Sequence, residues 1–434
     1  MKEIAPVMDR LRTQTRDEHI RVEALPFFRA LHARELPLAS YVGFLRALSI
    51  VYEVFEQALM HTRHSALTAV WDSSLHKLPL IDRDLAYFQA RGLPNAPVAL
   101  LRAHLLTQQV RQRAHDDPIS LLGYLYVLEG STLGGLVLKA QVARAFELTA
   151  SDGIAYLSSY EKSTRAHWQA FAGRMNGVLD DPAEQERVVA AAQEAFNGMG
   201  QIIAALYPFD ANPTGDLVRT LNPAAGSHAI PHDPRELQAA LRAGERTWRK
   251  FPYYQWRYGE RGQQFTRSDS AWLVTLAAHE QVVVNQQISW LGRVLSSRGM
   301  PQWMLELHLR MLHEELVEAV PENHASYDRL QAAADMLRDT RRRYIGEDVL
   351  AALTLQFDQQ VGAEWSAQLP YTGGLLAAAV ADQQAGISQA VKNIEAWMTD
   401  DARFPHHWIA AVQLTIRAAR EQAMGGDGAA SPPP

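Results

Sequence analysis

A cluster of three glycines lies in the middle of a segment that otherwise has the pattern of an α-helix. Residues 117–146 read DPISLLGYLYVLEGSTLGGLVLKAQVARAF, with apolar side chains at helical spacing on both sides of Gly130, Gly134 and Gly135. Each glycine inside a helix costs about 1 kcal/mol relative to alanine, so a bare backbone here must serve another purpose. Two purposes fit: close packing of a neighbouring helix, or a flat ligand lying against the main chain of a bent helix.

A histidine and three charged side chains form a stripe on the first predicted helix, residues 4–25. Arg12, Arg16, His19 and Glu23 follow one another at spacings of four, three and four residues. His19 lies about 60° from the centre of the apolar face, so its ring can point inward while Glu23 orients the other ring nitrogen. The arginines are like charges one turn apart, which is mildly destabilising unless an anion lies between them. The alternative is an edge histidine beside two solvated arginines.

The composition is that of a soluble globular protein and excludes several classes of function. Hydrophobic residues make up 47% and charged residues 21%, and 42 basic against 48 acidic side chains give a net charge of −6. This balance offers no general attraction to nucleic acid or anionic membranes. The absence of cysteine excludes disulfides, thiolate metal sites and a cysteine nucleophile. Residues 1–19 lack the apolar core of a signal peptide, and no membrane-spanning apolar run is evident, so we expect a cytoplasmic protein.

The length and the distribution of proline predict two domains. A chain of 434 residues is too long for one simple core. We expect a helical domain over residues 1–207, a proline-rich linker over 208–236, a second helical domain of unknown function over 237–424 and a disordered tail over 425–434. No alternating strand pattern occurs in either half. The predicted fold class is therefore all-α.

Helical periodicity predicts the remaining elements. In the first half it covers residues 41–59, 78–91, 97–112, 156–179 and 184–206. In the second half it covers residues 237–248, 270–297, 303–320, 327–344, 348–367, 374–399 and 408–424.

Two features of the second half could do chemistry but have simpler explanations. Residues 248–265, WRKFPYYQWRYGERGQQF, interleave aromatic and basic side chains, which can stack nucleic-acid bases. The acidic surroundings favour a structural cap or a partner-docking surface instead. His279-Glu280 and His313-Glu314, with His308 nearby, resemble metal-binding pairs, but the Glu-x-x-His spacing is absent. We expect these histidines on solvated helix faces.

Taken together, TRDEHIRVE around His19 and YLYVLEGSTLGGLVLK around Gly130 resemble the heme oxygenases, especially the bacterial type associated with bacteriophytochromes. The resemblance covers roughly the first 205 residues and does not extend to the second half. It implies that His19 is the proximal ligand of the heme iron and that Glu23 orients its imidazole. It also implies that Gly130, Gly134 and Gly135 belong to a distal helix whose bare backbone approaches the iron-bound oxygen.

The other site residues follow from the same resemblance. Arg12 and Arg16 match basic positions that meet the heme propionates. Ala172 falls where the family often has a further propionate-binding arginine, so the resemblance implies that Arg165 or Arg174 substitutes for it. Ser131 stands where many heme oxygenases have an aspartate that organises distal water, and its hydroxyl can bond water but cannot act as a carboxylate. The expected cofactor contacts are Arg12, Arg16, Glu23, Tyr126, Gly130, Gly134, Gly135 and Arg174, and the expected catalytic residues are Gly130, Ser131 and Gly134.

The implied reaction is the oxidative opening of heme to biliverdin, with release of CO and ferrous iron. Heme is then both substrate and cofactor. The reaction also requires O2 and an external electron donor, either a protein or a reductant. The family context adds a bilin-accepting phytochrome as a partner.

Two other classes of function remain open from the sequence. A non-degrading heme-binding or sensor protein would use the second half as an output or partner-docking module, and Ser131 and the fused domain favour it. A di-iron oxygenase would need several Glu, Asp and His ligands on facing helices, whereas the internal positions of the first half are chiefly apolar. Thiaminase-like relatives of this helical fold rely on a cysteine, which the chain lacks.

Overall fold

The computed structural model of the chain describes residues 5–148, 152–211, 216–226 and 228–425. These residues form helices and connecting segments without a strand, which confirms the predicted all-α class. The chain divides into two compact units, residues 1–220 and 221–434. The division falls inside the predicted linker, where Asp216–Leu221 form the short helix α11. The predicted tail, from residue 426 onward, lies outside the described residues.

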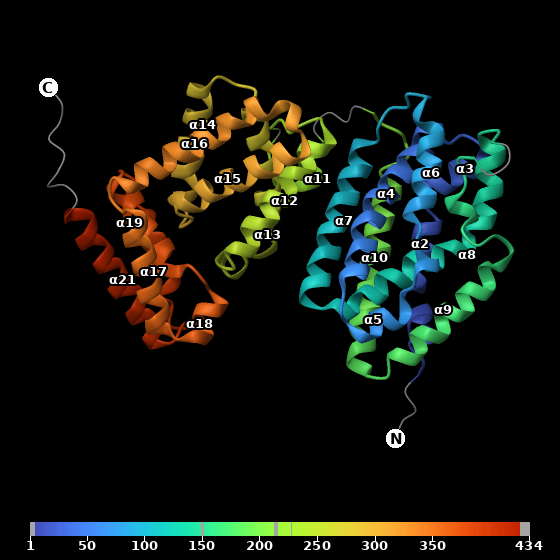
Figure 1. Cartoon of the computed structure of the whole chain (residues 1–434), viewed down its shortest axis with the longest axis horizontal. Coiled ribbons are helices and arrows are strands. Elements are labelled where there is room, and N and C mark those ends of the chain that lie inside the picture. Colours follow the sequence, from blue (N-terminus) through green and yellow to red (C-terminus); the bar gives the residue numbers. More distant parts are fainter. Residues whose placement is uncertain (1–4, 149–151, 212–215, 227, 426–434) are drawn as a thin grey trace. The chain divides into compact units, whose positions relative to one another are not determined.

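The predicted helix 156–179 begins only at Thr164, and residues 26–33 and 65–70 form short helices that were not predicted. Elsewhere the helices of the first unit follow the predicted periodicity. They are α1 (Val7–Gln14), α2 (Arg16–Glu23), α3 (Pro26–Ala33), α4 (Leu38–His61), α5 (Ser65–Val70), α6 (Leu78–Gln89), α7 (Pro97–Asp116), α8 (Leu121–Ala145), α9 (Thr164–Val178) and α10 (Pro182–Ala204). Short 3-10 turns η1 (Ser73–Leu75), η2 (Pro118–Ser120), η3 (Tyr156–Ser158) and η4 (Glu161–Ser163) connect them. Helix α7 packs against α4 and α10, and α10 also packs against α8 (Figure 1).

The prediction of one continuous N-terminal helix was wrong, because α1 ends and α2 begins around Thr15. The backbone of Thr15 departs from helical values at φ −109°, ψ 9°. Its side chain is buried, and Oγ1 donates to Leu11 O at 2.8 Å. A threonine that bonds the carbonyl four residues earlier tends to bend a helix. The predicted apolar face nevertheless holds, since Val7 and Leu11 are fully buried.

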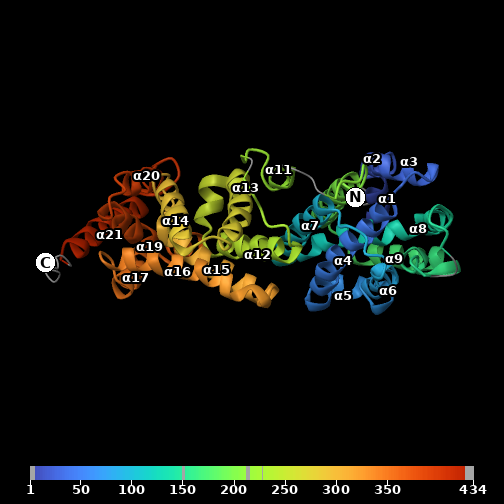
Figure 2. The same ribbon diagram turned by 90° about the horizontal axis from the view of Figure 1, so that it is seen from above.

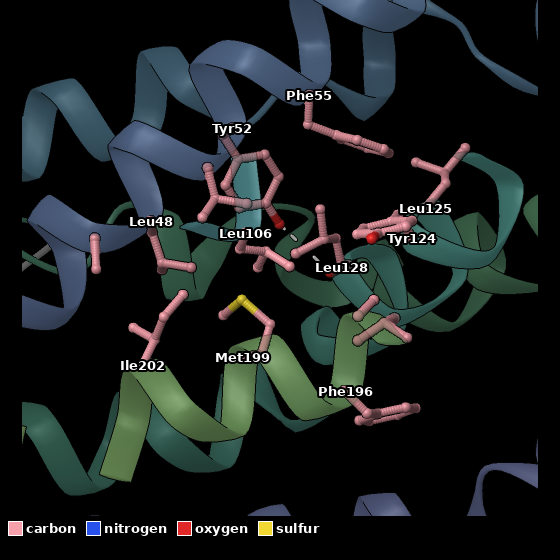
Figure 3. Packing of buried hydrophobic residues seen from close by; sticks show 14 of the residues in the cluster. Leu48, Tyr52, Phe55, Leu106, Tyr124, Leu125, Leu128, Phe196, Met199 and Ile202 are labelled. Atoms are coloured by element: carbon pink, nitrogen blue, oxygen red, sulfur yellow. Dashed lines mark hydrogen bonds between the residues drawn. The ribbon is translucent and has the colours of Figure 1, made fainter. Parts of the chain in front are cut away.

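The core of the first unit lies where α4, α7, α8 and α10 meet. Figure 3 shows the buried side chains of this region, including Leu48, Tyr52, Phe55, Leu106, Leu128, Phe196, Met199 and Ile202. Two helical segments, Leu38–His61 and Pro118–Ala145, have the length and mean hydropathy (1.4 for each) of a membrane span. Of these apolar windows, 67% and 50% are buried inside the protein. Core helices of soluble proteins have the same properties.

The second unit is also built of helices. They are α12 (Pro234–Lys250), α13 (Tyr253–Leu276), α14 (Gln281–Ser296), α15 (Gln302–Ala319), η5 (Pro321–Asn323), α16 (His324–Arg342), α17 (Glu347–Val361), α18 (Ala363–Gln368), α19 (Thr372–Gln384), α20 (Ala390–Met398) and α21 (His406–Gly425). Helix α15 packs against α12 and α16, and α19 packs against α17 and α21 (Figure 2).

Three long helices predicted for the second unit are each divided in the structure. The segment 270–297 is interrupted between α13 and α14. The segments 348–367 and 374–399 break at Gly362 (φ 83°) and Gly386 (φ 97°), where a left-handed backbone ends the helix. The aromatic stretch 248–265 lies mostly in α13, which is kinked at Gly259 (φ 54°, ψ −151°).

The predicted solvated position of His308 was wrong, because this side chain is buried. Its Nδ1 lies 2.9 Å from Thr247 Oγ1 and its Nε2 lies 3.0 Å from Ser270 Oγ. His308 lies on α15 among other buried residues, including Trp303, Leu305 and Leu309, so this part of the helix has no wide solvent-facing side.

Candidate active site

A cavity of about 740 Å³ lies in the first unit, and residues of α2, α8 and α10 contribute to its lining. It receives side chains from segments far apart in the sequence, which is typical of a ligand site. Six of the residues singled out from the sequence line it: His19, Glu23, Tyr126, Gly130, Ser131 and Gly134. Most of the remaining lining is apolar or aromatic: Val22, Phe28, Phe44, Leu48, Val127, Leu128, Leu133, Val137, Leu138, Leu157, Trp168, Phe196, Met199 and Ile203.

His19 is oriented by one neighbour on its own helix and one on α10. Its Nδ1 lies 3.5 Å from Glu23 Oε2, one turn later. The imidazole meets the ring of Phe196 edge-on, with the centroids 5.8 Å apart. A carboxylate beside Nδ1 favours the neutral tautomer with its proton on that atom, which leaves the Nε2 lone pair free for a metal. The side chain is 56% exposed, so the ring is accessible.

The glycines of α8 divide between the two purposes that the sequence left open. A Cβ atom on Gly134 would meet nothing within 4 Å, so neighbour packing does not require this glycine. A Cβ on Gly130 would lie 3.5 Å from the Trp168 ring, an ordinary contact at the cavity wall. A Cβ on Gly135 would lie 3.0 Å from Leu157 O, and Gly135 is absent from the cavity lining. Gly135 therefore serves the packing of η3, and its contact with heme stays a prediction.

Helix α8 is continuous from Leu121 to Ala145, so the glycines do not interrupt it. The 3-10 turn η2 precedes it, and there Asp117 caps no backbone N–H but accepts from Ser120 Oγ at 2.7 Å. A buried ion pair fixes its middle: Lys77 Nζ lies 3.0 Å from Glu129 Oε2, and both side chains are buried. Lys77 Nζ also donates to Tyr160 OH at 2.7 Å. The backbone next to Gly130 is thus anchored from the side away from the cavity.

Three hydroxyl groups form a chain that reaches the cavity. Ser131 Oγ donates to Leu128 O at 2.7 Å and lies 3.4 Å from Tyr156 OH. Tyr156 OH lies 3.3 Å from Tyr52 OH. Burial raises the pKa of both tyrosines, so both keep their protons at neutral pH. The cavity therefore presents phenol and serine hydroxyls, rather than a carboxylate, beside Gly130.

Tyr156 and Asp84, which positions it, were not singled out from the sequence. Asp84 is fully buried and accepts from the backbone N–H groups of Ala155 (2.7 Å) and Tyr156 (2.9 Å). Burial raises the pKa of the Asp84 carboxyl, and the two N–H groups partly offset this effect. A signal existed: Asp84 shares the apolar face of α6 with Ile81 and Phe88, where a carboxylate needs buried donors.

The three arginines predicted to meet an anion lie outside the cavity lining. Arg12 pairs with Asp9 at 3.2 Å, and Arg174 pairs with Asp72 at 3.2 Å. Arg16 is exposed on α2. Burial raises the pKa of the Tyr126 phenol, and the nearby charge of Arg12 opposes this effect. Arg12 is thus close to one lining residue, and the propionate contacts of all three arginines stay predictions.

The residues present fit a heme. Leu133 and Val137 are 45% and 65% exposed although both are apolar and line the cavity, so a flat apolar ligand would cover them. His19 offers an imidazole nitrogen, and Gly134 leaves space above the backbone of α8. Within the described ranges, no group of three or more His, Asp or Glu side chains could hold a metal ion on its own.

The first half of the chain is similar to known proteins. The heme oxygenase family model matches residues 5–205. Heme oxygenase 1 of Gallus gallus is 25% identical over 205 residues, covering 45% of this chain and 68% of the relative. Heme oxygenase 1 of Homo sapiens is 23% identical over 195 residues, covering 43% and 66%. The matched region thus spans about two thirds of these relatives.

Solved structures are similar over the same half. The heme oxygenase from Leptospira interrogans aligns with a TM-score of 0.42 and 22% identity, covering 46% of this chain and 99% of that one. Heme oxygenase-1 from the cyanobacterium Synechocystis sp. PCC6803, solved in complex with heme, aligns with a TM-score of 0.42 and 21% identity, covering 50% and 96%. The second half has no match to a family. Residues 5–205 of this chain thus match the heme oxygenase family.

Proposed function

We propose that the chain is a heme oxygenase that opens heme to biliverdin, with release of CO and ferrous iron. The observation that carries this proposal is the cavity that joins His19 on α2 to the bare backbone of Gly130 and Gly134 on α8. The family match over residues 5–205 supports it.

The side chains of this cavity have distinct roles in binding. His19 would hold the heme iron through Nε2, and Glu23, 3.5 Å from Nδ1, would keep the imidazole in the required tautomer. The leucine, valine and phenylalanine side chains would exclude water from both faces of the ring system. Arg12, Arg16 and Arg174 would meet the propionates at the edge, which for Arg12 and Arg174 requires exchanging a carboxylate partner.

Proton delivery would fall to the hydroxyl chain beside Gly130. When bound, heme supplies the iron that activates O2 and the carbon skeleton that is oxidised. Ser131 Oγ already donates to Leu128 O, so it acts best as an acceptor there. Tyr156, kept protonated by burial, can donate to Ser131 or to a water in the cavity. The phenol takes over part of the water-organising role that an aspartate has in many family members.

The proposal is tested by absorption spectroscopy. The full-length protein with hemin, a reductant and O2 should convert a Soret spectrum into that of biliverdin. His19→Ala should lose the histidine-ligated signature, whereas His32→Ala, which changes an exposed histidine outside the cavity, should keep it. Turnover by His19→Ala at the wild-type rate, with an unchanged spectrum, would reject His19 as the ligand.

One observation favours a second function, a heme-binding sensor that does not degrade its ligand. Among the residues that the structure describes, Glu23 is the only carboxylate in the cavity lining, and Ser131 Oγ donates its proton to Leu128 O. A Soret band that persists under reductant and O2, together with a heme-dependent change in protease sensitivity of the second unit, would support this function. Conversion to biliverdin would exclude it.

The proposed reaction implies several partners. It consumes O2 and electrons from an external donor, either a protein or a chemical reductant, and its product could pass to a bilin-accepting phytochrome.

We infer a cytoplasmic location, which the burial of the two most apolar helices supports. Fractionation of cells that express the chain would test this inference, and recovery in the membrane fraction would contradict it.

A further inference from the structure

The second unit contains a cavity of its own, here called the second-unit cavity, of about 520 Å³. It lies among α12, α13, α14 and α15, and all of its lining residues belong to that unit. Its volume falls in the range of small-molecule sites. Its apolar lining consists of Phe265, Leu273, Leu291, Leu295, Met300 and Leu305.

One wall of the second-unit cavity is polar but uncharged. His308 lies between Thr247 and Ser270, at 2.9 and 3.0 Å, and burial lowers the pKa of its imidazole to about 4. Neutral at physiological pH, the imidazole has one N–H and one lone pair, and the two hydroxyls satisfy both. This wall therefore holds the cavity in shape without adding charge.

Two arginines without salt bridges also line the second-unit cavity. Arg261 and Arg298 are exposed, and neither forms a salt bridge within the part of the chain that the structure describes. The guanidinium of Arg261 lies over the ring of Phe265, 5.9 Å from its centroid. The backbone of Arg298 is held by Tyr258, whose OH donates to Arg298 O at 2.8 Å. Two cationic side chains thus lie at the border of an apolar space.

The lining also contains one carboxyl group and two further aromatic rings. Burial raises the pKa of Asp269 to about 6, and the charge of Arg298 opposes this effect. The two arginines therefore leave the cavity with a net positive charge even when Asp269 is ionised. Tyr254 stacks on Trp248 with the ring centroids 5.0 Å apart, and Tyr258 adjoins Tyr254. These rings offer flat surfaces against which a planar ligand can stack.

We propose that the second-unit cavity binds an aromatic organic anion, a flat apolar molecule whose carboxylates pair with Arg261 and Arg298. Guanidinium groups bind carboxylates through paired hydrogen bonds, and the leucine and tyrosine side chains match an apolar ring system. An open-chain tetrapyrrole with two carboxylates belongs to this chemical class, and that source rests on the proposed function of the first unit. An unrelated aromatic anion is the other source.

The test uses the full-length chain with one equivalent of hemin and no reductant, so that the first cavity is occupied. Two probes are titrated by fluorescence and absorption: biliverdin, and the aromatic sulfonate 8-anilinonaphthalene-1-sulfonate. The variants are Arg261→Gln, Arg298→Gln and the double substitution. The matched control is Arg293→Gln, which changes an exposed arginine of α14 outside the cavity lining. The three arginines that these four variants change are all exposed, so each variant should fold.

Each arginine variant should raise the dissociation constant of a bound probe about tenfold, because it removes a charge-assisted hydrogen bond. Arg293→Gln should leave the dissociation constant unchanged. Arginine-dependent binding of biliverdin supports the site and identifies the tetrapyrrole as its ligand. Such binding of the sulfonate alone supports the site with the other source. If neither probe binds, or if the double variant binds as wild type does, the proposal is overturned.

The same variants separate this proposal from the function of the first unit. Hemin turnover should be unaffected by Arg261→Gln and Arg298→Gln, since both residues lie in the second unit. If the wild-type protein binds the probe but does not turn over hemin, the proposed oxygenase activity is rejected and the second-unit cavity remains a binding site. Intact turnover without probe binding would reject only the second-unit site.

Discussion

Replacing Gly134 by alanine should stabilise the ligand-free first unit while impairing its proposed activity. A Cβ at this position would meet no atom within 4 Å, so the methyl group causes no clash. Alanine is preferred over glycine inside a helix by about 1 kcal/mol. For a domain of this size, that gain corresponds to a rise of about 2–4 °C in melting temperature. The added methyl group lies beside the cavity, where it would compete with a flat ligand for the space above α8.

Gly123→Ala is the matched control on the same helix. Its Cβ would lie 2.2 Å from Val188 O and 2.6 Å from Ala192 N, both backbone atoms of α10. The two helices would have to move apart, and overpacking of this kind costs about 1–3 kcal/mol or more. Gly123 does not line the cavity, so this variant should lose stability through packing alone.

Calorimetric melting of the full-length chain measures both effects, and the transition that Gly123→Ala lowers is assigned to the first unit. Hemin titration and the rate of biliverdin formation then report on the site. We expect Gly134→Ala to melt higher than wild type, to bind hemin more weakly and to turn it over more slowly. If Gly134→Ala melts lower, or if it binds and degrades hemin as wild type does, Gly134 does not border a heme site in the way argued here.

Four further substitutions test the buried polar groups. Lys77→Met leaves the Glu129 carboxylate buried without its cation and should lower the free energy of unfolding by about 3–5 kcal/mol, measured by urea denaturation; a loss below 1 kcal/mol would contradict the ion pair. Tyr156→Phe keeps the ring and should retain hemin binding while slowing biliverdin formation, whereas wild-type turnover would exclude the phenol from proton delivery. The pKa of His308 is lowered to about 4, so the buried neutral imidazole contributes on the order of 3 kcal/mol to the free energy of unfolding above pH 6.5, and this contribution is lost as the pH falls toward 4. His308→Gln should make the urea midpoint less dependent on pH over this range. The pKa of Asp382 is raised to about 7 by burial, so its protonated carboxyl contributes to the free energy of unfolding below pH 4, and this contribution is lost as the pH rises toward 7. Asp382→Asn should remove that loss, and an unchanged dependence of stability on pH would refute the role of Asp382.

The sequence was most informative where one local pattern determines the structure. Helical periodicity identified the long helices α4, α6, α7, α8 and α10 of the first unit, and the spacing of His19 and Glu23 anticipated their contact one turn apart. The glycines of α8 indicated that something approaches the backbone, but not which glycine meets what. Gly135 approaches Leu157, which is 22 residues later in the chain, and no local pattern specifies such a contact.

Side chains that depend on tertiary neighbours were harder to predict. Tyr156 reaches the cavity because Asp84, 72 residues earlier, holds its backbone N–H. His308 is neutral and buried because Thr247 and Ser270, on two other helices, supply hydroxyl partners. In each case the sequence contains the residue but not the pairing, since the partners lie on separate helices whose packing the periodicity does not specify.

Helix α8 shows why a segment with unfavourable helix propensity remains a single helix. Its glycines give up roughly 1 kcal/mol each relative to alanine. At Gly123 that loss is offset because the backbone of α10 can approach more closely than a side chain would allow, and at Gly135 the approach of η3 has the same effect. Glu129 adds a buried ion pair on the face away from the cavity. At Gly134 a Cβ would meet no atom within 4 Å, so close packing does not explain this glycine, and its cost accords with the proposed ligand site. The position that contributes least to the stability of the helix is therefore the one that points most directly to function.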